Sequence, residues 1–223
     1  MSKIGFYKQG NVCALGDTNK NLIDNTITFD SWSIGSGWIK KVDSDGTTIN
    51  YQFTRTGATA NNWVRIIPTL KINGNDYPNG ITISMDLLTP DKSAINQKCL
   101  GSTQTYQENG SRIGWAEPQW DLTNIINDKW SRITYLFPQS YLLVNNTAGT
   151  TYAYTQFSFQ LVQNGDITIR RIKAEAGNKK TPFIVSDTDA GFTNSSTGFI
   201  ERGILQPPSF YKNFIESTEF IEI

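Results

Sequence analysis

Acidic side chains are the first candidates for chemistry in this sequence. The chain of 223 residues has 20 Asp and Glu residues and no histidine, so it lacks the side chain best suited to proton transfer near neutral pH and the commonest metal ligand. Two carboxylates about 5 to 9 Å apart suffice for a glycosidase, but 20 acidic residues will place some pair at that separation in almost any fold. We therefore predict no catalytic residues and no enzyme.

The motifs of other catalytic and metal sites are also missing. The sequence has no Gly-x-Ser-x-Gly elbow, phosphate-binding loop or dinucleotide fingerprint. Asp43, Asp45 and Gly46 have some calcium-loop character, but this composition is more typical of a plain turn. Cys13 and Cys99 lie too far apart for a disulfide framework or a metal site, and we expect buried or idle thiols. We predict no metal and no cofactor.

Surface aromatic and amide residues are the remaining candidates, and they suit a neutral glycan. Sugars have apolar C–H faces that stack on Trp or Tyr, and hydroxyls that pair with amides and arginine. Tyr152, Tyr154 and Gln156 belong to the more polar row of one predicted strand, which we expect to face outward. For any single aromatic residue, packing in the core is the alternative. The other candidates lie on a predicted neighbouring strand face and in a predicted loop: Asn50, Gln52, Trp115 and Trp120.

Alternating strands must position these residues. Apolar and polar residues alternate in "TTINYQFT", "GITISMDLL", "SRITYLF" and "YAYTQFSFQLV", as half-buried strands require. Asp-Gly and Asn-Gly pairs between such segments indicate tight turns, and no long segment has the helical period. We predict an all-β fold, a two-sheet antiparallel β-sandwich of jelly-roll type with extended N- and C-terminal arms.

Two local features make sharper predictions. Asn164-Gly165 separates "FSFQLV" from "DITIRRI" and predicts that these strands pair as a hairpin with a type I′ turn. The apolar positions slip by one residue at Arg170-Arg171, which predicts a β-bulge with the arginines near an edge or in solvent. The alternative is an arginine pair that binds a carboxylate or phosphate.

The two ends of the chain differ from the middle. Gly177, Asn178 and Pro182 interrupt the last strand, so we predict a jelly-roll domain at 21–186, an N-terminal arm at 1–20 and a C-terminal docking arm at 187–223. Apolar residues in both arms are too many for a free tail and too thinly spread for a separate core. We interpret the arms as assembly segments, with intramolecular strands as the alternative. The predicted assembly residues are Phe199, Phe210, Tyr211, Phe214 and Phe220.

Charge and hydropathy indicate the kind of partner. The 20 basic residues balance the 20 acidic ones, so the chain has no overall field to hold a nucleic acid or an anionic membrane. No apolar run approaches the roughly 18 to 20 residues that span a bilayer, and the first residues lack the apolar stretch of a secretory signal. We predict neither nucleic acid nor membrane as a partner.

Three segments resemble a known group of domains. "NLIDNTITFDSWSIGSGW" at 21–38 and "DKWSRITYLF" at 128–137 resemble the entry and middle strands of jelly-roll carbohydrate-binding modules. "ITIRRIKAEAGNKKTPF" at 167–183 is similar to the closing strand of the version found in bacteriophage tail and minor structural proteins, which ends in a Lys-x-Glu-x-Gly-Asn-x-x-Thr run. The residues of that run here are Lys173, Glu175, Gly177, Asn178 and Thr181. The resemblance covers about residues 21–186.

The resemblance implies a function and also shows a departure. It implies a non-enzymatic virion structural protein of the tail, baseplate or a fibre, located in the virion, which forms a homo-oligomer with other virion proteins as partners and contacts host-surface polysaccharide. The alternatives are a purely structural spacer or cement protein and, third, a glycan-degrading enzyme. Secreted modules of this fold often hold calcium with an acidic residue on the closing strand, where this chain has Arg170 and Arg171, so we expect no calcium.

Overall fold

The computed structural model describes residues 4–6, 12–14, 20–26, 29, 31–44, 46, 48–68, 70–145, 152–183 and 186. Nearly all regular structure in these residues is β. One sheet contains β3 (Ser33–Ile34), β6 (Val64–Ile67), β7 (Lys71–Ile72), β9 (Ser102–Gln107), β10 (Arg112–Ala116) and β12 (Tyr152–Leu161). The other contains β4 (Trp38–Val42), β5 (Ile49–Arg55), β8 (Ile81–Leu88), β11 (Ser131–Phe137) and β13 (Gly165–Ala176). The short helices are η2 (Gly74–Asp76), η3 (Lys92–Ala94) and α1 (Gln139–Leu142), and β1 (Ile4–Phe6) pairs with β2 (Val12–Ala14).

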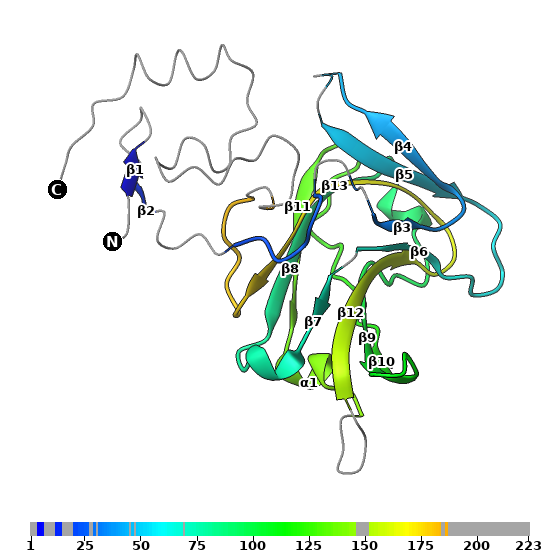
Figure 1. Ribbon diagram of the computed structural model, residues 1–223. Coiled ribbons are helices and arrows are strands. Elements are labelled where there is room, and N and C mark those ends of the chain that lie inside the picture. Colours follow the sequence, from blue (N-terminus) through cyan, green and yellow to red (C-terminus); the bar gives the residue numbers. More distant parts are fainter. Residues whose placement is uncertain are drawn as a thin grey trace.

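The two large sheets pack face to face as a sandwich (Figure 1). The strand order is β10-β9-β12-β6-β3 in the six-stranded sheet, with β7 also beside β12, and β11-β8-β13-β5-β4 in the five-stranded sheet. Every strand pair in both sheets is antiparallel. The predicted all-β sandwich of jelly-roll type is confirmed. The four segments predicted from alternation correspond to β5, β8, β11 and β12.

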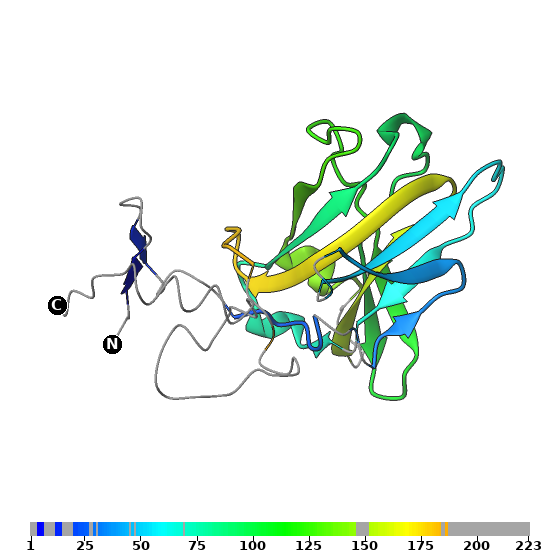
Figure 2. The same cartoon turned by 90° about the horizontal axis from the view of Figure 1, so that it is seen from above.

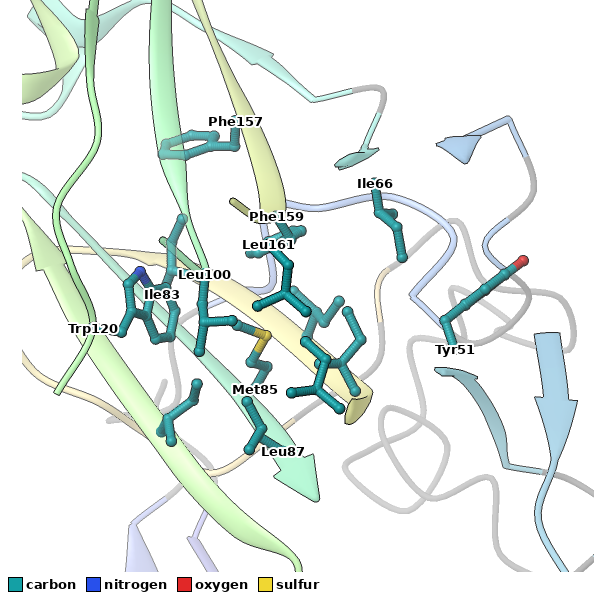
Figure 3. Packing of buried hydrophobic residues seen from close by; sticks show 14 of the residues in the cluster. Tyr51, Ile66, Ile83, Met85, Leu87, Leu100, Trp120, Phe157, Phe159 and Leu161 are labelled. Carbon is teal, nitrogen blue, oxygen red and sulfur yellow. The ribbon is translucent and has the colours of Figure 1, made fainter. Parts of the chain in front are cut away.

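The core fills the space between the sheets (Figure 3). Phe157 and Phe159 on β12 face Ile83 and Met85 on β8, and all four side chains are buried. The ring of Phe157 also packs edge-on against Phe137, with centroids 5.7 Å apart. Because each large aromatic ring removes on the order of 150 to 250 Å² from water, these contacts provide much of the energy that holds the sheets together.

The bulge predicted at Arg170-Arg171 is present, but its place in the sheet differs from the prediction. The pairing of β13 with β8 shifts between Arg170 and Lys173, and Arg171 has a φ of 49°. However, β13 lies between β8 and β5 in the middle of its sheet, as its long yellow ribbon shows in Figure 2. The Arg170 side chain is only 14% exposed. The prediction that both arginines lie near an edge or in solvent is therefore wrong for Arg170.

The predicted hairpin at Asn164-Gly165 is wrong. β12 and β13 belong to different sheets, so residues 162–164 cross from one sheet to the other. Neither Asn164 nor Gly165 has the positive φ of a type I′ turn. Instead, the Asn164 amide accepts from the Ala58 N–H at 2.7 Å and donates to the Ala58 carbonyl at 3.1 Å. Asn164 thus fixes the crossover to the chain that follows β5.

A buried ion pair on the outer side of the five-stranded sheet holds the segment after β13 against that strand. Lys173 and Glu175 lie two residues apart on β13, with Nζ and Oε2 separated by 3.1 Å and both side chains fully buried. Lys173 also donates to the Thr181 hydroxyl at 2.5 Å and to the Pro182 carbonyl at 2.9 Å. Glu175 accepts from the Thr181 N–H at 2.9 Å and from its hydroxyl. Burial lowers the pKa of Lys173, and the charge of Glu175 opposes that shift.

The start of the domain meets the same strand. The Asn21 side chain donates to the Ile172 carbonyl at 3.1 Å and accepts from the Ala174 N–H at 3.1 Å. The Leu22 N–H then donates to the Ala174 carbonyl at 2.7 Å. Beyond the bulge, β13 is therefore paired with the entry segment instead of with β5. The Asn-Leu opening and the Lys-x-Glu…Thr run of the resemblance are both parts of this closure.

Several predictions concern residues outside the described part of the chain. These include the predicted assembly residues of the C-terminal arm, Phe199, Phe210, Tyr211, Phe214 and Phe220. The domain limits at 21 and 186 stay a prediction. Among the residues that the structure does describe, no helix is long and apolar enough to cross a membrane.

Candidate functional site

Aromatic and amide side chains gather on the outer face of the six-stranded sheet. Tyr154 and Gln156 on β12 lie directly across from Tyr106 and Gln104 on β9. The two tyrosine rings stack with centroids 5.1 Å apart and an interplanar angle of 16°. The Tyr106 hydroxyl donates to the side-chain amide oxygen (Oε1) of Gln104 at 2.5 Å, and burial raises the pKa of Tyr106. The result is a flat aromatic pair beside two amides.

Trp115 extends this surface at the outer strand. It pairs with Gln104 across β10 and β9, so it faces the same side, and it is 55% exposed. A cation flanks each end: the Arg112 guanidinium lies 5.0 Å from the Trp115 ring centroid, and Lys71 Nζ lies 4.4 Å from that of Tyr154. We define the aromatic face as Tyr106, Tyr154, Trp115, Gln104, Gln156, Lys71 and Arg112.

The outward row of β12 continues from the aromatic face to a charged end. Gln160 accepts from Arg65 Nε on β6 at 2.8 Å and donates to Glu117 at 3.3 Å. From Tyr154 to Gln160 the strand rises by about 20 Å. We call this row the polar track; it is buried at its far end, where Ser158 is 4% and Gln160 is 1% exposed, and the inward row of β12 supports it from the core.

Tyr152 does not join this face, although the sequence grouped it with Tyr154. The pairing of β12 with β9 shifts between Tyr152 and Tyr154, which changes the side to which Tyr152 points. Its hydroxyl accepts from the Gly74 N–H at 2.6 Å and bonds to the Thr155 hydroxyl at 2.9 Å. Tyr152 thus anchors η2 instead of presenting a free ring beside Tyr154.

Asn50 and Gln52 lie on the other sheet. Their strand β5 pairs with β4 and β13, not with β12. Asn50 donates to Asp43 at 2.7 Å, and Gln52 donates to Asp166 at 2.9 Å. The expectation that they share a surface with Tyr154 is wrong, because alternation identifies the face of a strand but not its neighbour.

Trp120 belongs to the core. It is 2% exposed and stacks on Tyr135 with centroids 5.9 Å apart, among the buried residues of Figure 3. Trp115, which the sequence placed in the same loop, lies on β10 instead. The expectation of two exposed tryptophans in a loop is therefore wrong for Trp120 and correct only in the exposure of Trp115.

Sequence reasoning missed β9 and with it Tyr106 and Gln104. The inward positions of β9 are Thr103 and Thr105, whose hydroxyls donate to the carbonyls of Tyr141 and Val144, each at 2.7 Å. With hydroxyls in place of apolar side chains, "STQTYQ" lacks the alternation that marks a half-buried strand. The alternation of threonine with larger polar residues was the available signal.

The arginines of the bulge bind a carboxylate within the protein. Asp86 on β8 lies 3.0 Å from Arg132, 3.6 Å from Arg170 and 3.7 Å from Arg171. Arg170 also pairs with Asp43 and lies 3.8 Å from the Trp130 ring centroid. This network joins β8, β11 and β13 to Asp43, the residue after β4, on the outer side of the five-stranded sheet. No group of three His, Cys, Asp or Glu residues in the described part of the chain could hold a metal.

Cys99 is a buried thiol, as expected, and its chemistry can be tested. Its Sγ donates to the Gly101 carbonyl at 3.2 Å and accepts from Gln160 at 3.2 Å, and burial raises its pKa. In a Cys13→Ser variant, we expect an aromatic disulfide reagent at pH 8 to modify Cys99 roughly 100-fold more slowly than in the unfolded chain, because the thiolate is the nucleophile and modification requires opening. Equal rates in the folded and unfolded chains would contradict this.

Comparison with known proteins adds a likeness in fold. No protein-family model and no curated protein sequence matches the chain. Similar solved structures include the tripod (BppUct-A-L) from the baseplate of bacteriophage Tuc2009, with 20% identity and a TM-score of 0.44 over 76% of this chain and 59% of that chain. Another is the enzymatically active domain of bacteriophage CBA120 tailspike protein 4, with 7% identity and a TM-score of 0.40 over 70% of this chain and 21% of that chain.

A third similar structure is the CBM22-1 xylan-binding domain of Paenibacillus barcinonensis Xyn10C, with 11% identity and a TM-score of 0.40 over 73% of this chain and 95% of that domain. This chain thus spans about three fifths of the tripod chain and one fifth of the tailspike chain.

Proposed function

We propose that this chain is a non-enzymatic virion protein of a bacteriophage, in the tail, baseplate or a fibre, and that its jelly-roll domain binds host-surface glycan through the aromatic face. The observation that carries the proposal is the combination of stacked Tyr106 and Tyr154, exposed Trp115 and two amides on one outward sheet face.

The chemistry of the aromatic face fits a polyhydroxylated ligand. Sugar C–H faces pack on the rings of Tyr154 and Trp115, while the half-buried Gln156 amide supplies both a donor and an acceptor for hydroxyls. The side chains stand on paired strands above a packed core, so little ordering of the backbone is needed on binding. The cations over the rings are long and exposed, and they can turn from the rings toward ligand oxygens.

The closing-strand run supports the virion context. Lys173, Glu175, Gly177, Asn178 and Thr181 match the run that ends this domain in phage tail and minor structural proteins. In this proposal the arms at 1–20 and 187–223 join the chain to copies of itself and to other virion proteins. Deleting residues 198–223 should abolish incorporation into particles while the sandwich stays folded; normal incorporation of the shortened chain would contradict the docking role.

A spacer or cement protein without glycan binding is the second candidate, and one observation favours it. Edge strand β4 exposes Ile39 and Val42, at 61% and 58%, beside an edge that no other strand of the described residues covers and that another protein could cover. A glycan array probed with the full chain separates the two candidates. Binding to host cell-wall polysaccharide supports the glycan proposal, whereas silence on the array with stoichiometric incorporation into particles supports the spacer.

A further inference from the structure

An open hollow lies beyond the charged end of the polar track. Its volume is about 470 Å³, and residues of both sheets line it. Phe53 and Arg55 come from β5, and Val64 and Arg65 come from β6. Phe53 and Val64 are core residues, so they give the hollow an apolar floor. The hollow thus opens between the two sheets beside their β3 and β4 edges.

Two glycines keep the rim of the hollow clear. A Cβ on Gly35 would lie 2.6 Å from the Arg65 carbonyl oxygen, and one on Gly37 would lie 2.7 Å from the Phe53 ring. Gly37 also has a φ of +95°, a conformation that other residues rarely adopt. A larger residue at either position would clash with the surrounding chain, so this part of the rim requires glycine.

The chemistry of the lining is cationic and aromatic. Arg55 and Arg65 are its charged residues, and Trp63, 41% exposed, and Asn62 complete the polar rim. In the part of the chain that the structure describes, neither arginine forms an ion pair, and Arg65 is held by Gln160 alone. These two arginines differ from those of the bulge, which are matched by Asp86 and Asp43.

Arg65 lines the hollow and donates to Gln160 of the polar track, which is only 1% exposed, so the connection between the hollow and the aromatic face runs through buried side chains. No Asp or Glu of the described residues lines the hollow with Arg55 and Arg65, and Lys71 and Arg112 add positive charge at the aromatic face. The whole chain has a formal net charge of zero, so the excess of positive charge is local. A local excess of this kind attracts an anion and is screened by salt.

We propose that the hollow binds the anionic group, a carboxylate or a phosphate, of the same glycan that the aromatic face contacts, so that the ligand is an acidic polysaccharide. This inference rests on the proposed function and names its ligand class. Arg55 and Arg65 present planar donors that match carboxylate or phosphate oxygens, and Trp63 offers a ring to the adjoining sugar.

The test uses the full chain and three polymers: polygalacturonate, its fully methyl-esterified neutral form, and a poly(glycerol phosphate). The variants are Arg55→Gln and the double variant Arg55→Gln with Arg65→Gln. Arg55 has no partner among the described residues, so its single replacement should leave the fold unchanged. Arg171→Gln, on the other sheet and 49% exposed, is the matched control for the loss of one positive charge.

We expect at least one acidic polymer to bind more tightly than the neutral one, and this binding to weaken with salt. Arg55→Gln should lower its affinity about 10-fold and the double variant about 100-fold, since each arginine makes a charge-assisted bond. Arg171→Gln should have no effect. The polymer that binds identifies the anion as carboxylate or phosphate.

The outcomes separate the two proposals. Equal binding of neutral and acidic polymers, unaffected in the Arg55 variants, overturns the anion site and leaves the glycan face standing. Acidic binding that is lost in the Arg55 variants but unchanged in a Tyr154→Ala, Trp115→Ala variant supports the anion site and overturns the aromatic face. Failure of the full chain to bind any of the polymers or host polysaccharide overturns both.

Discussion

Replacing Lys173 with methionine is expected to lower the free energy of unfolding by about 3 to 5 kcal/mol. The reason is that the Glu175 carboxyl group would stay fully buried and lose the ammonium group that lies 3.1 Å away. The Thr181 N–H and hydroxyl would still reach Glu175, but neutral donors do not replace a positive charge. Urea unfolding of the variant and the wild type, followed by tryptophan fluorescence, measures the difference.

Two further variants make this prediction specific. Lys173→Met combined with Glu175→Leu removes both charges and should recover most of the loss, because a buried pair replaced by apolar side chains is often close to neutral. Arg171→Met, on the same strand but 49% exposed, should cost less than about 1 kcal/mol. A single Lys173 variant as stable as the Arg171 variant would show that the pair does not close the sandwich.

Replacing Tyr154 and Trp115 together with alanine is expected to weaken binding to host cell-wall polysaccharide by about 100-fold. Each ring contributes roughly 1 to 1.5 kcal/mol of stacking, or about a factor of ten. The two residues lie on β12 and β10 with β9 between them, so their effects should be nearly additive. Isothermal titration calorimetry of the single and double variants measures each step.

The control for this prediction is Ile39→Ala, which removes an apolar side chain about as exposed as Trp115 from the other sheet. It should leave the affinity unchanged. The control should unfold within about 1 kcal/mol of the wild type, because Ile39 is exposed, whereas the double variant should lose roughly 1 to 2 kcal/mol with the stacking of Tyr154 on Tyr106 and should stay folded. A folded double variant that binds as tightly as the wild type would place the ligand elsewhere.

The sandwich could be predicted from the sequence because its central strands alternate cleanly. β8 and β11 combine inward Ile, Met and Phe with outward polar residues, and the structure reproduces both segments. β9 was missed because Thr103 and Thr105 fill its inward positions and bond to carbonyls. The Asn164-Gly165 hairpin was wrong because a turn dipeptide carries no information on whether the chain stays in one sheet.

The bulge at Arg170 could also be predicted, whereas its surroundings could not. A register slip is visible in one strand alone, but the depth of that strand depends on its neighbours. The sequence does not show that β13 lies between β8 and β5, or that Asp86 lies opposite the bulge and forms ion pairs with Arg170 and Arg171. The sequence therefore predicted an edge or solvent position for Arg170 and offered an external carboxylate or phosphate as the alternative, whereas the structure pairs the arginines with Asp86 and Asp43 of the same chain.

Which of the predicted glycan-binding residues share a surface depends on the pairing of strands that are distant in sequence. Tyr154, Gln156 and Trp115 come together on the six-stranded sheet, because their three positions align across β9. Tyr152 does not lie on the aromatic face because the strand register shifts beside it, and Trp120 does not because it is buried in the core. The residues that carry the resemblance, Lys173 and Thr181, hold the fold together, so they specify the domain and say little about its ligand.

The most direct test of the glycan face is an NMR titration that follows the six tryptophan indole N–H signals of the ¹⁵N-labelled full chain as host cell-wall oligosaccharide is added. Single Trp→Phe variants assign the signals. The Trp115 signal should shift, while those of Trp38 and Trp120, which are buried, should not. The Trp130 signal should also stay unchanged, because Trp130 packs on Arg170 at the other sheet. A shift at Trp130 with Trp115 unchanged would contradict the assignment of the glycan face.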